Sequence, residues 1–183
     1  MTLDLRIAMM ADVPALNALI AISARELSAG FYTPQQTEAL LTHVFGVDTQ
    51  LVADGTYFVV EGTDSVDGLV AAGGWSARRT LYGGDKAKSA EDPRLDPAAD
   101  PARIRAFFIH PRWARRGLGR RLYAECESAA RAAQFRSFEL MATLPGEPFY
   151  AALGFTVIER LTVQLAGDVA VPLVAMQRPI HPR

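Results

Sequence analysis

The sequence FFIHPRWARRGLGRRL at residues 107–122 is the most informative stretch of the chain. The residues leading into it alternate as a strand does, and His110-Pro111 stops that strand. Gly117 and Gly119 then open a helix whose apolar residues fall on one face. The stretch therefore predicts a strand, a loop and a glycine-rich helix start in direct succession.

Four arginines crowd this predicted helix start: Arg115, Arg116, Arg120 and Arg121. A helix N-terminus carries a partial positive charge, so each cation there costs roughly 0.3–1 kcal/mol. A bound polyanion resolves the conflict. Free N–H groups donate to phosphate oxygens, glycines allow close backbone approach, and arginines supply countercharge. The segment therefore indicates a phosphate site, with a solvated basic turn as the alternative.

Two other phosphate-binding motifs fit less well. A P-loop is excluded because Gly-Lys-Ser/Thr is absent. A dinucleotide-binding fingerprint places an acidic residue about twenty positions on, as Glu139 is, but its third glycine would fall at Leu122. An NAD(P)-dependent oxidoreductase is thus kept only as a remote alternative.

The rest of the chain reads as one mixed α/β domain over residues 1–183. Loops are expected at residues 64–68 and 80–102, and hairpins flank a central strand–helix–strand unit, which favours a mixed sheet with helices on both faces. Strands are predicted at residues 3–7, 56–61, 68–75, 103–109, 137–141, 155–164 and 171–176. Helices are predicted between Asp12 and Gly30, from Thr33 to Phe45, and at residues 117–133 and 148–153.

Composition limits the kinds of partner and the cellular compartment to be expected. The chain has 183 residues, a net charge of −1 and 50% hydrophobic residues, which argues against a nucleic-acid surface. Cys126 is its one cysteine, so no intrachain disulfide forms and a reducing compartment is favoured. No signal-like segment or apolar run of ~20 residues predicts a membrane partner. We therefore expect a cytoplasmic protein. No cluster has metal-ligand spacing.

The stretch at 107–122 resembles the acyl-CoA-binding motif of the GNAT superfamily of N-acetyltransferases. In that pattern a strand ends in a small apolar residue, followed by His-Pro and then Gln/Arg-x-x-Gly-x-Gly/Ala at a helix start. Ile109, His110-Pro111 and Gly117-Leu118-Gly119 match it. Ala114 departs from it, because it stands at the Gln/Arg position.

A second block, PFYAALGF at residues 148–155, resembles the family's Phe-Tyr-x-x-x-Gly-Phe signature. The family often has Asn seven residues before the tyrosine, where this chain has Thr143. Both blocks occur in family order, so the resemblance extends over nearly the whole chain.

The resemblance implies a GNAT-like α/β fold. Its central sheet is mixed, mostly antiparallel and twisted, with six to seven strands flanked by about four helices, and splayed central strands bind CoA. It implies direct transfer of an acetyl (acyl) group from acetyl-CoA to a primary amine, without a metal. The cofactor-binding residues it implies are Phe107, Phe108, Ile109, Ala114, Arg115, Arg116, Gly117, Leu118, Gly119, Arg120 and Thr143.

Tyr150 is the expected catalytic residue by family position, because a tyrosine can donate a hydrogen bond to the leaving thiolate. The general base is left open among Glu61, Asp85, Glu139, Glu147 and a water chain.

The acceptor is expected to be a small-molecule amine with an apolar part, held by Phe31, Tyr32, Trp75 and the 80–102 loop. Ala114 and Thr143 also leave open an acyl-CoA-binding regulatory module without turnover. The oligomeric state is open as well, and a homodimer is kept as one option.

Overall fold

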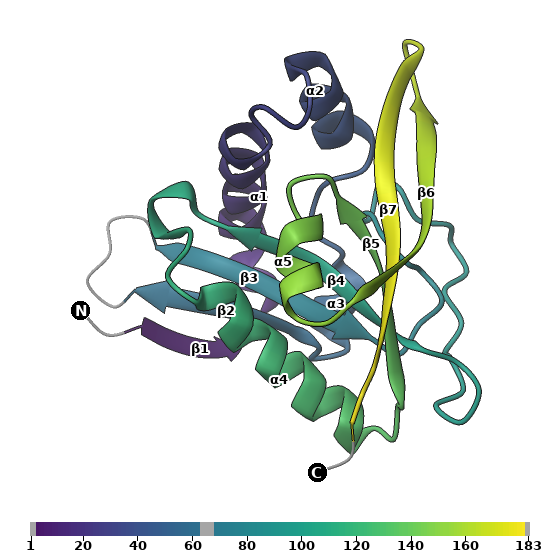
Figure 1. The fold of residues 1–183 in the computed structure, drawn as a ribbon. Coiled ribbons are helices and arrows are strands. Elements are labelled where there is room, and N and C mark those ends of the chain that lie inside the picture. The colour runs from purple at the N-terminus through teal and green to yellow at the C-terminus, as the bar shows by residue number, and fades with distance from the viewer. Residues whose placement is uncertain (1–2, 63–67, 182–183) are drawn as a thin grey trace.

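The computed structural model describes residues 3–62 and 68–181, and their strands form one open sheet of seven (Figure 1). The strand order is β1-β2-β3-β4-β5-β7-β6, and only the β4–β5 pair is parallel. The predicted fold class is therefore confirmed. The strands are β1 Leu3–Ile7, β2 Tyr57–Gly62, β3 Leu69–Ser76, β4 Ala102–Ile109, β5 Ser137–Thr143, β6 Thr156–Leu165 and β7 Val169–Pro179.

Within residues 3–62 and 68–181, five α-helices and two 3-10 turns accompany the sheet. Proline in the first turn and a capping box between Thr33 and Gln36 explain where the second helix begins. Asp12 precedes the first helix as predicted, but its carboxylate binds Arg6 and the N–H of Met9 instead of capping that helix. The helices are α1 Val13–Leu27, α2 Pro34–His43, α3 Thr49–Ala53, α4 Leu118–Ala132 and α5 Glu147–Ala152, with 3-10 turns at Met10–Asp12 and Pro111–Trp113.

The helices cover both faces of the sheet. In Figure 1, α4 and α5 lie in front of the sheet, with α1 behind. Strand alternation supplies a core for each face: Val60 packs into the cluster under α4, and Val59 packs into the cluster under α1. The turn expected at residues 64–68 lies outside the described residues except for Gly68. No helix among the described residues is long and apolar enough to cross a membrane.

The parallel strands β4 and β5 separate after a short contact. Their ladder consists of Ala102 opposite Phe138 and Arg103 opposite Glu139, and then it ends. From there β4 continues along β3 as far as Ile109, and β5 continues along β7. The two central strands therefore diverge, and the backbone of β4 that faces β5 has no sheet partner beyond this point.

A β-bulge lies in β4 where the strands part. Ala106 has φ 54°, and the β3–β4 register shifts between Ala72 and Gly74. The extra residue resets the alternation of side chains. Phe107 consequently packs toward the core under α4, while Ala106 and Phe108 pack toward the core under α1.

The long segment between β3 and β4 is well ordered, although its sequence has no period. Its main anchor is Arg105 of β4, whose guanidinium donates to the carbonyls of Thr80 at 3.0 Å and Gly83 at 2.6 Å. Arg105 also pairs with Asp48 at 3.0 Å, and both side chains are at most 2% exposed. The ammonium of Lys88 contacts the same carboxylate.

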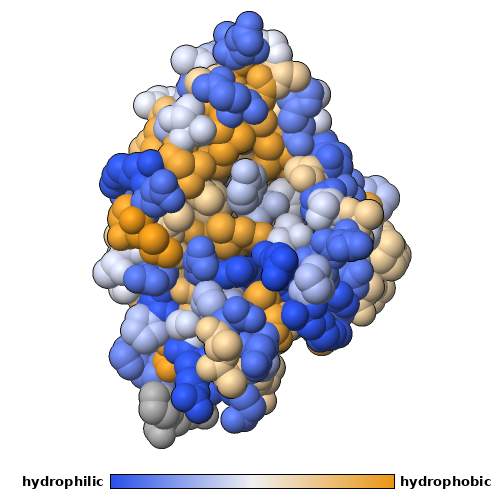
Figure 2. Space-filling view, turned by 90° about the vertical axis from the view of Figure 1, so that its right-hand side faces the viewer, coloured by the Kyte–Doolittle hydropathy of each residue, from blue (hydrophilic) through white to orange (hydrophobic). Residues whose placement is uncertain are grey.

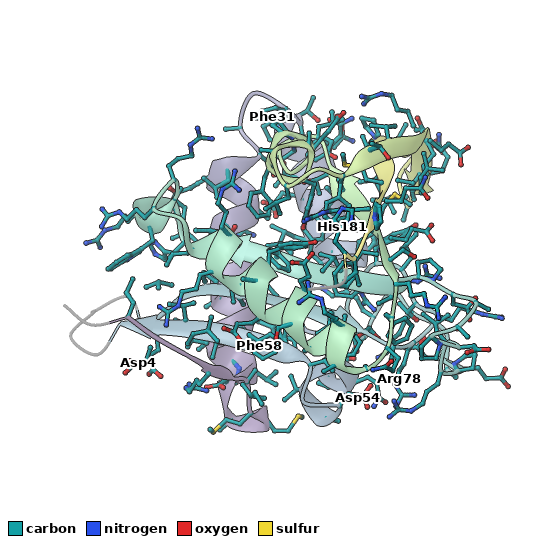
Figure 3. All side chains as sticks on the ribbon, turned by 60° about the horizontal axis from the view of Figure 1, so that its bottom comes forward. Asp4, Phe31, Asp54, Phe58, Arg78 and His181 are labelled. Carbon is teal, nitrogen blue, oxygen red and sulfur yellow. The ribbon has the colours of Figure 1, made fainter. Side chains whose placement is uncertain are left out.

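A second ion pair holds the start of this segment. The Arg78 guanidinium pairs with Asp54 at 2.6 Å, and the two side chains lie together in Figure 3. Arg78 holds the pKa of Asp54 below its usual range. The segment is therefore fixed at its start and along residues 80–88, where the sequence predicts only a loop.

We predict that Asp48→Ala lowers the free energy of unfolding by about 3–5 kcal/mol, because Arg105 then stays buried without its counter-ion. Urea denaturation followed by circular dichroism measures this loss. Glu38→Ala is the matched control, since Glu38 pairs with Arg25 at the surface and its removal should leave stability nearly unchanged. Equal effects of the two substitutions would contradict the role given to the buried pair.

Candidate active site

The start of α4 presents an open set of backbone donors. Gly117 is the N-cap with φ 82°, and no side chain caps this end. The first intrahelical bond runs from the N–H of Arg121 to the carbonyl of Gly117 at 3.1 Å. The N–H groups of Leu118, Gly119 and Arg120 therefore precede the helical ladder and point out of the helix end.

Space is left beside this turn. A Cβ built on Gly117 would meet no atom within 4 Å, so the glycine is required by its left-handed φ and leaves open room next to the donors. Arg115 also has a positive φ of 64°. For a residue that is not glycine this conformation is uncommon, and it brings a second left-handed residue into the same turn.

The arginines of this turn are exposed and lack acidic partners. Among the described residues, no carboxylate pairs with Arg115, Arg116 or Arg120. The Arg116 guanidinium lies over the ring of Trp113 at 4.9 Å. Arg121 differs, because it donates to the carbonyl of Leu3 and so ties α4 to the edge of the sheet.

Aromatic rings connect the helix start with the splayed strands. A Cβ on Gly119 would lie 2.9 Å from the ring of Phe149, so α5 packs directly on the first turn of α4. Phe149 in turn contacts Phe107 and Tyr150, with ring centroids 6.2 and 5.1 Å away. The side chain of Leu118 is buried in the core, which leaves only its backbone for a ligand.

Tyr150 lies on α5 against the divergent end of β4. Its ring centroid is 6.2 Å from that of Phe107. Among the described residues, no group forms a hydrogen bond with its hydroxyl. Burial, with a smaller contribution from Cys126, raises the pKa of Tyr150, so the hydroxyl stays protonated at neutral pH and can act as a donor.

The remaining residues expected at the cofactor site lie along the same path. Thr143 ends β5, and its hydroxyl accepts a hydrogen bond from the N–H of Gly146 at 3.2 Å. Ala114 is half-buried in the loop before α4. The N–H of Ile109 donates to the hydroxyl of Ser23 at 3.2 Å, so this group is already used within the protein. No pattern in the sequence pointed to Ser23.

The four carboxylates considered as general base differ in their partners. Glu61 pairs with Arg6, and Glu139 pairs with Arg103 at the closed end of the β4–β5 ladder. Glu139 is therefore no free ribose ligand, which removes the support for a dinucleotide.

The other two carboxylates differ from each other. Arg160 binds both oxygens of Glu147 and holds the pKa of that carboxyl below its usual range, which makes it a weak base. Asp85 borders a hollow of about 470 Å³ between α1, α2 and the 80–89 loop.

The expected acceptor residues do not form one site. Phe31 is exposed in the α1–α2 connection (Figure 3). Tyr32 is buried, and its hydroxyl donates to the carbonyl of Pro172 and accepts from the N–H of Leu144. Trp75 is buried in the core under α4 against Phe135. A direct acceptor contact is therefore not supported for Tyr32 or Trp75.

A second hollow, of about 500 Å³, lies between the 80–89 loop, the end of α2 and β6. Figure 2 faces this side of the molecule, and hydrophobic residues gather over its upper half around a recess. The sequence pattern marks the loop but none of the hollow's lysines. Among the described residues, no group of three potential ligands could hold a metal ion.

Comparison with known proteins supports the family resemblance. Residues 97–175 match the model of the acetyltransferase (GNAT) domain. This segment is therefore similar to a GNAT acetyltransferase domain. It contains β4, the arginine-rich turn, α4, β5 and α5, so the resemblance drawn from the sequence and the acyltransferase class are both confirmed.

Solved structures agree with a GNAT fold across the whole chain. A GCN5-related N-acetyltransferase from Rhodopseudomonas palustris is 19% identical, with a TM-score of 0.69, covering 98% of this chain and 96% of its own. YncA from Salmonella typhimurium, solved with acetyl-CoA, is 16% identical, with a TM-score of 0.62 and coverages of 100% and 96%.

The ribosomal-protein-S18-alanine N-acetyltransferase from Escherichia coli is 14% identical, with a TM-score of 0.61 and coverages of 100% and 96%. At these identities the likeness to solved GNAT structures shows the fold alone. A search of curated proteins finds no match.

We predict that Gly119→Ala lowers the free energy of unfolding by about 1–2 kcal/mol, because its Cβ would collide with the ring of Phe149. The double variant Gly119→Ala/Phe149→Leu should recover part of the loss, since the leucine leaves room for the methyl group. Urea denaturation of the single and double variants measures the coupling. Additive losses would show that α5 does not pack on α4 in this way.

Proposed function

We propose that this chain transfers an acetyl group from acetyl-CoA to the primary amine of a small molecule, and that it works as one catalytic domain in the cytoplasm. The observation that carries the proposal is the uncapped start of α4, with its exposed arginines, next to the gap between β4 and β5. The lone Cys126 suits a reducing compartment.

The residues present fit a CoA thioester. Diphosphate oxygens are complementary to the N–H groups at the start of α4 and to the guanidinium groups of Arg115, Arg116 and Arg120. The open space beside Gly117 gives the diphosphate room. The backbone of β4 beyond Arg103 has no partner strand on its β5 side, so it can hydrogen-bond an extended amide-bearing arm.

When bound, the thioester supplies an electrophilic carbonyl for the amine. This chain then has three tasks: holding the arm, positioning the amine, and handling protons. The C–N bond forms as the C–S bond breaks, and Tyr150 gives its proton to the departing thiolate sulfur. The amine proton leaves to water or to a carboxylate, for which Asp85 is the candidate: it borders the 470 Å³ hollow and lies 3.6 Å from Lys88, which lines the neighbouring 500 Å³ hollow.

The second candidate function is an acyl-CoA sensor without turnover. Ala114 and Thr143 favour it, since both stand where the family pattern has amide- or guanidinium-bearing side chains. Both functions require CoA binding, and only the transferase requires Tyr150 as a proton donor.

We expect CoA at a hundred times its Kd to raise the free energy of unfolding by about 2.7 kcal/mol. Thermal denaturation with CoA, and with NAD+ as the control nucleotide, measures this effect. Stabilisation by NAD+ but not by CoA would overturn the cofactor assignment.

We expect Tyr150→Phe to lower kcat about 100-fold while leaving the Kd for CoA unchanged, because the substitution removes only the proton donor. Release of free thiol from acetyl-CoA with a panel of primary amines gives the rate. Tyr123→Phe is the matched control, a buried tyrosine that contacts Arg178 and Glu127 away from the β4–β5 gap. Absence of thiol release with every amine would leave the sensor function.

A further inference from the structure

We propose that the 500 Å³ hollow beside the 80–89 loop is the acceptor site, and that it selects an amine carrying a carboxylate on an apolar body. We call it the acceptor hollow. It is lined by residues 80–82 and 86–89 of the loop, His43 and Val44 at the end of α2, and Val163 and Leu165 of β6. The inference rests on the proposed transferase function and adds its substrate class.

Two lining residues of the acceptor hollow connect it to the splayed strands. On the β4 side, the carbonyl of Thr80 accepts a hydrogen bond from Arg105, the residue just before the bulge. On the β5 side, Tyr82 packs in the same hydrophobic cluster as Met141. The lining of the hollow is therefore linked to β4 and to β5, and we place the amine there, facing a thioester held between the two strands.

The lining of the acceptor hollow is cationic on one side. His43, Lys86 and Lys88 contribute to it, and none of the eleven described residues that line it is acidic. The ammonium of Lys88 is paired with the carboxylate of Asp48, and its nitrogen lies 3.6 Å from a carboxylate oxygen of Asp85.

Lys86 has a different environment. Lys86 lines both hollows, and its ammonium donates to the carbonyl of Leu41, a residue of the 470 Å³ hollow, at 2.8 Å. No described carboxylate lies within 4 Å of this ammonium. Around the hollow, three cations (Arg105, Lys86 and Lys88) face the two carboxylates Asp48 and Asp85. The excess positive charge is located at Lys86.

Lysine is rare in this protein. The sequence contains two lysines, and both line the acceptor hollow. A lysine ammonium is a compact point charge on a flexible stem, which can adjust to a carboxylate carried by a small ligand.

The opposite side of the acceptor hollow is apolar. Val44, Leu81, Val163 and Leu165 supply it. Hydrophobic residues also dominate the upper half of the face shown in Figure 2. A ligand with a hydrocarbon body against this side and a carboxylate toward Lys86 satisfies both halves of the lining.

The test compares two amines that differ by one carboxylate, phenylalanine and 2-phenylethylamine. The readout is the ratio of their kcat/KM values for thiol release from acetyl-CoA. We expect the wild-type protein to favour phenylalanine, and Lys86→Met to lower the ratio about tenfold, the size of one charge-assisted hydrogen bond at a partly exposed site. The effect of amine basicity cancels when variants are compared.

Two further variants control for charge and for the loop itself. Lys86→Arg keeps the cation and should retain most of the preference. Arg79→Met removes an exposed cation of the same segment that does not line the acceptor hollow, and should leave the ratio unchanged. A wild-type ratio near one, or equal loss of both amines in Lys86→Met, would overturn the inference while the transferase function stands.

A binding measurement separates the inference from the function. Calorimetry with 3-phenylpropionate, in the presence of CoA, needs no turnover. Binding to the wild-type protein that weakens about tenfold in Lys86→Met supports the anion-selective hollow even when no amine releases thiol, a result that would refute the transferase function alone. Absence of binding to the wild-type protein counts against the acceptor hollow in either case.

Discussion

The separation of β4 from β5 is the constraint on which the rest of the structure depends. Two residue pairs hold these parallel strands together at one end, and the bulge at Ala106 follows directly. The side chains before and after the bulge pack on opposite faces of the sheet. Arg105 fixes the 80–89 loop on one face, and Phe107 packs on Tyr150 on the other. One local irregularity thus sets the position of both halves of the site.

The charged residues also differ between the two faces of the sheet. The start of α4 concentrates exposed arginines where the helix dipole disfavours them, which an anionic ligand would offset. The opposite face has one fully buried ion pair, Arg105 with Asp48, and this pair orders a long segment that lacks secondary structure. The arginines lower the local stability of the free protein at the start of α4. The Arg105–Asp48 pair holds the wall of the acceptor hollow in place. Both are consistent with a protein organised around a ligand that crosses the sheet.

Periodic segments were predictable from the sequence, and long-range contacts were not. The regular spacing of apolar residues predicted α4 correctly, and the glycine pattern identified the helix start and the family. The five-residue α3 is too short to show a helical period. The order of the 80–89 loop comes from Arg105 and Asp48, which are 57 positions apart. Trp75 was expected at the acceptor, but its strand alternation turns it into the core under α4.

The central claim is that CoA lies with its diphosphate on the start of α4 and its arm between β4 and β5. A crystal structure of this chain with CoA tests it most directly. We expect diphosphate oxygens within hydrogen-bond distance of the N–H groups of Leu118 and Gly119, and the thiol near the hydroxyl of Tyr150. A diphosphate bound elsewhere, or an arm that does not enter the gap between the two strands, would contradict it.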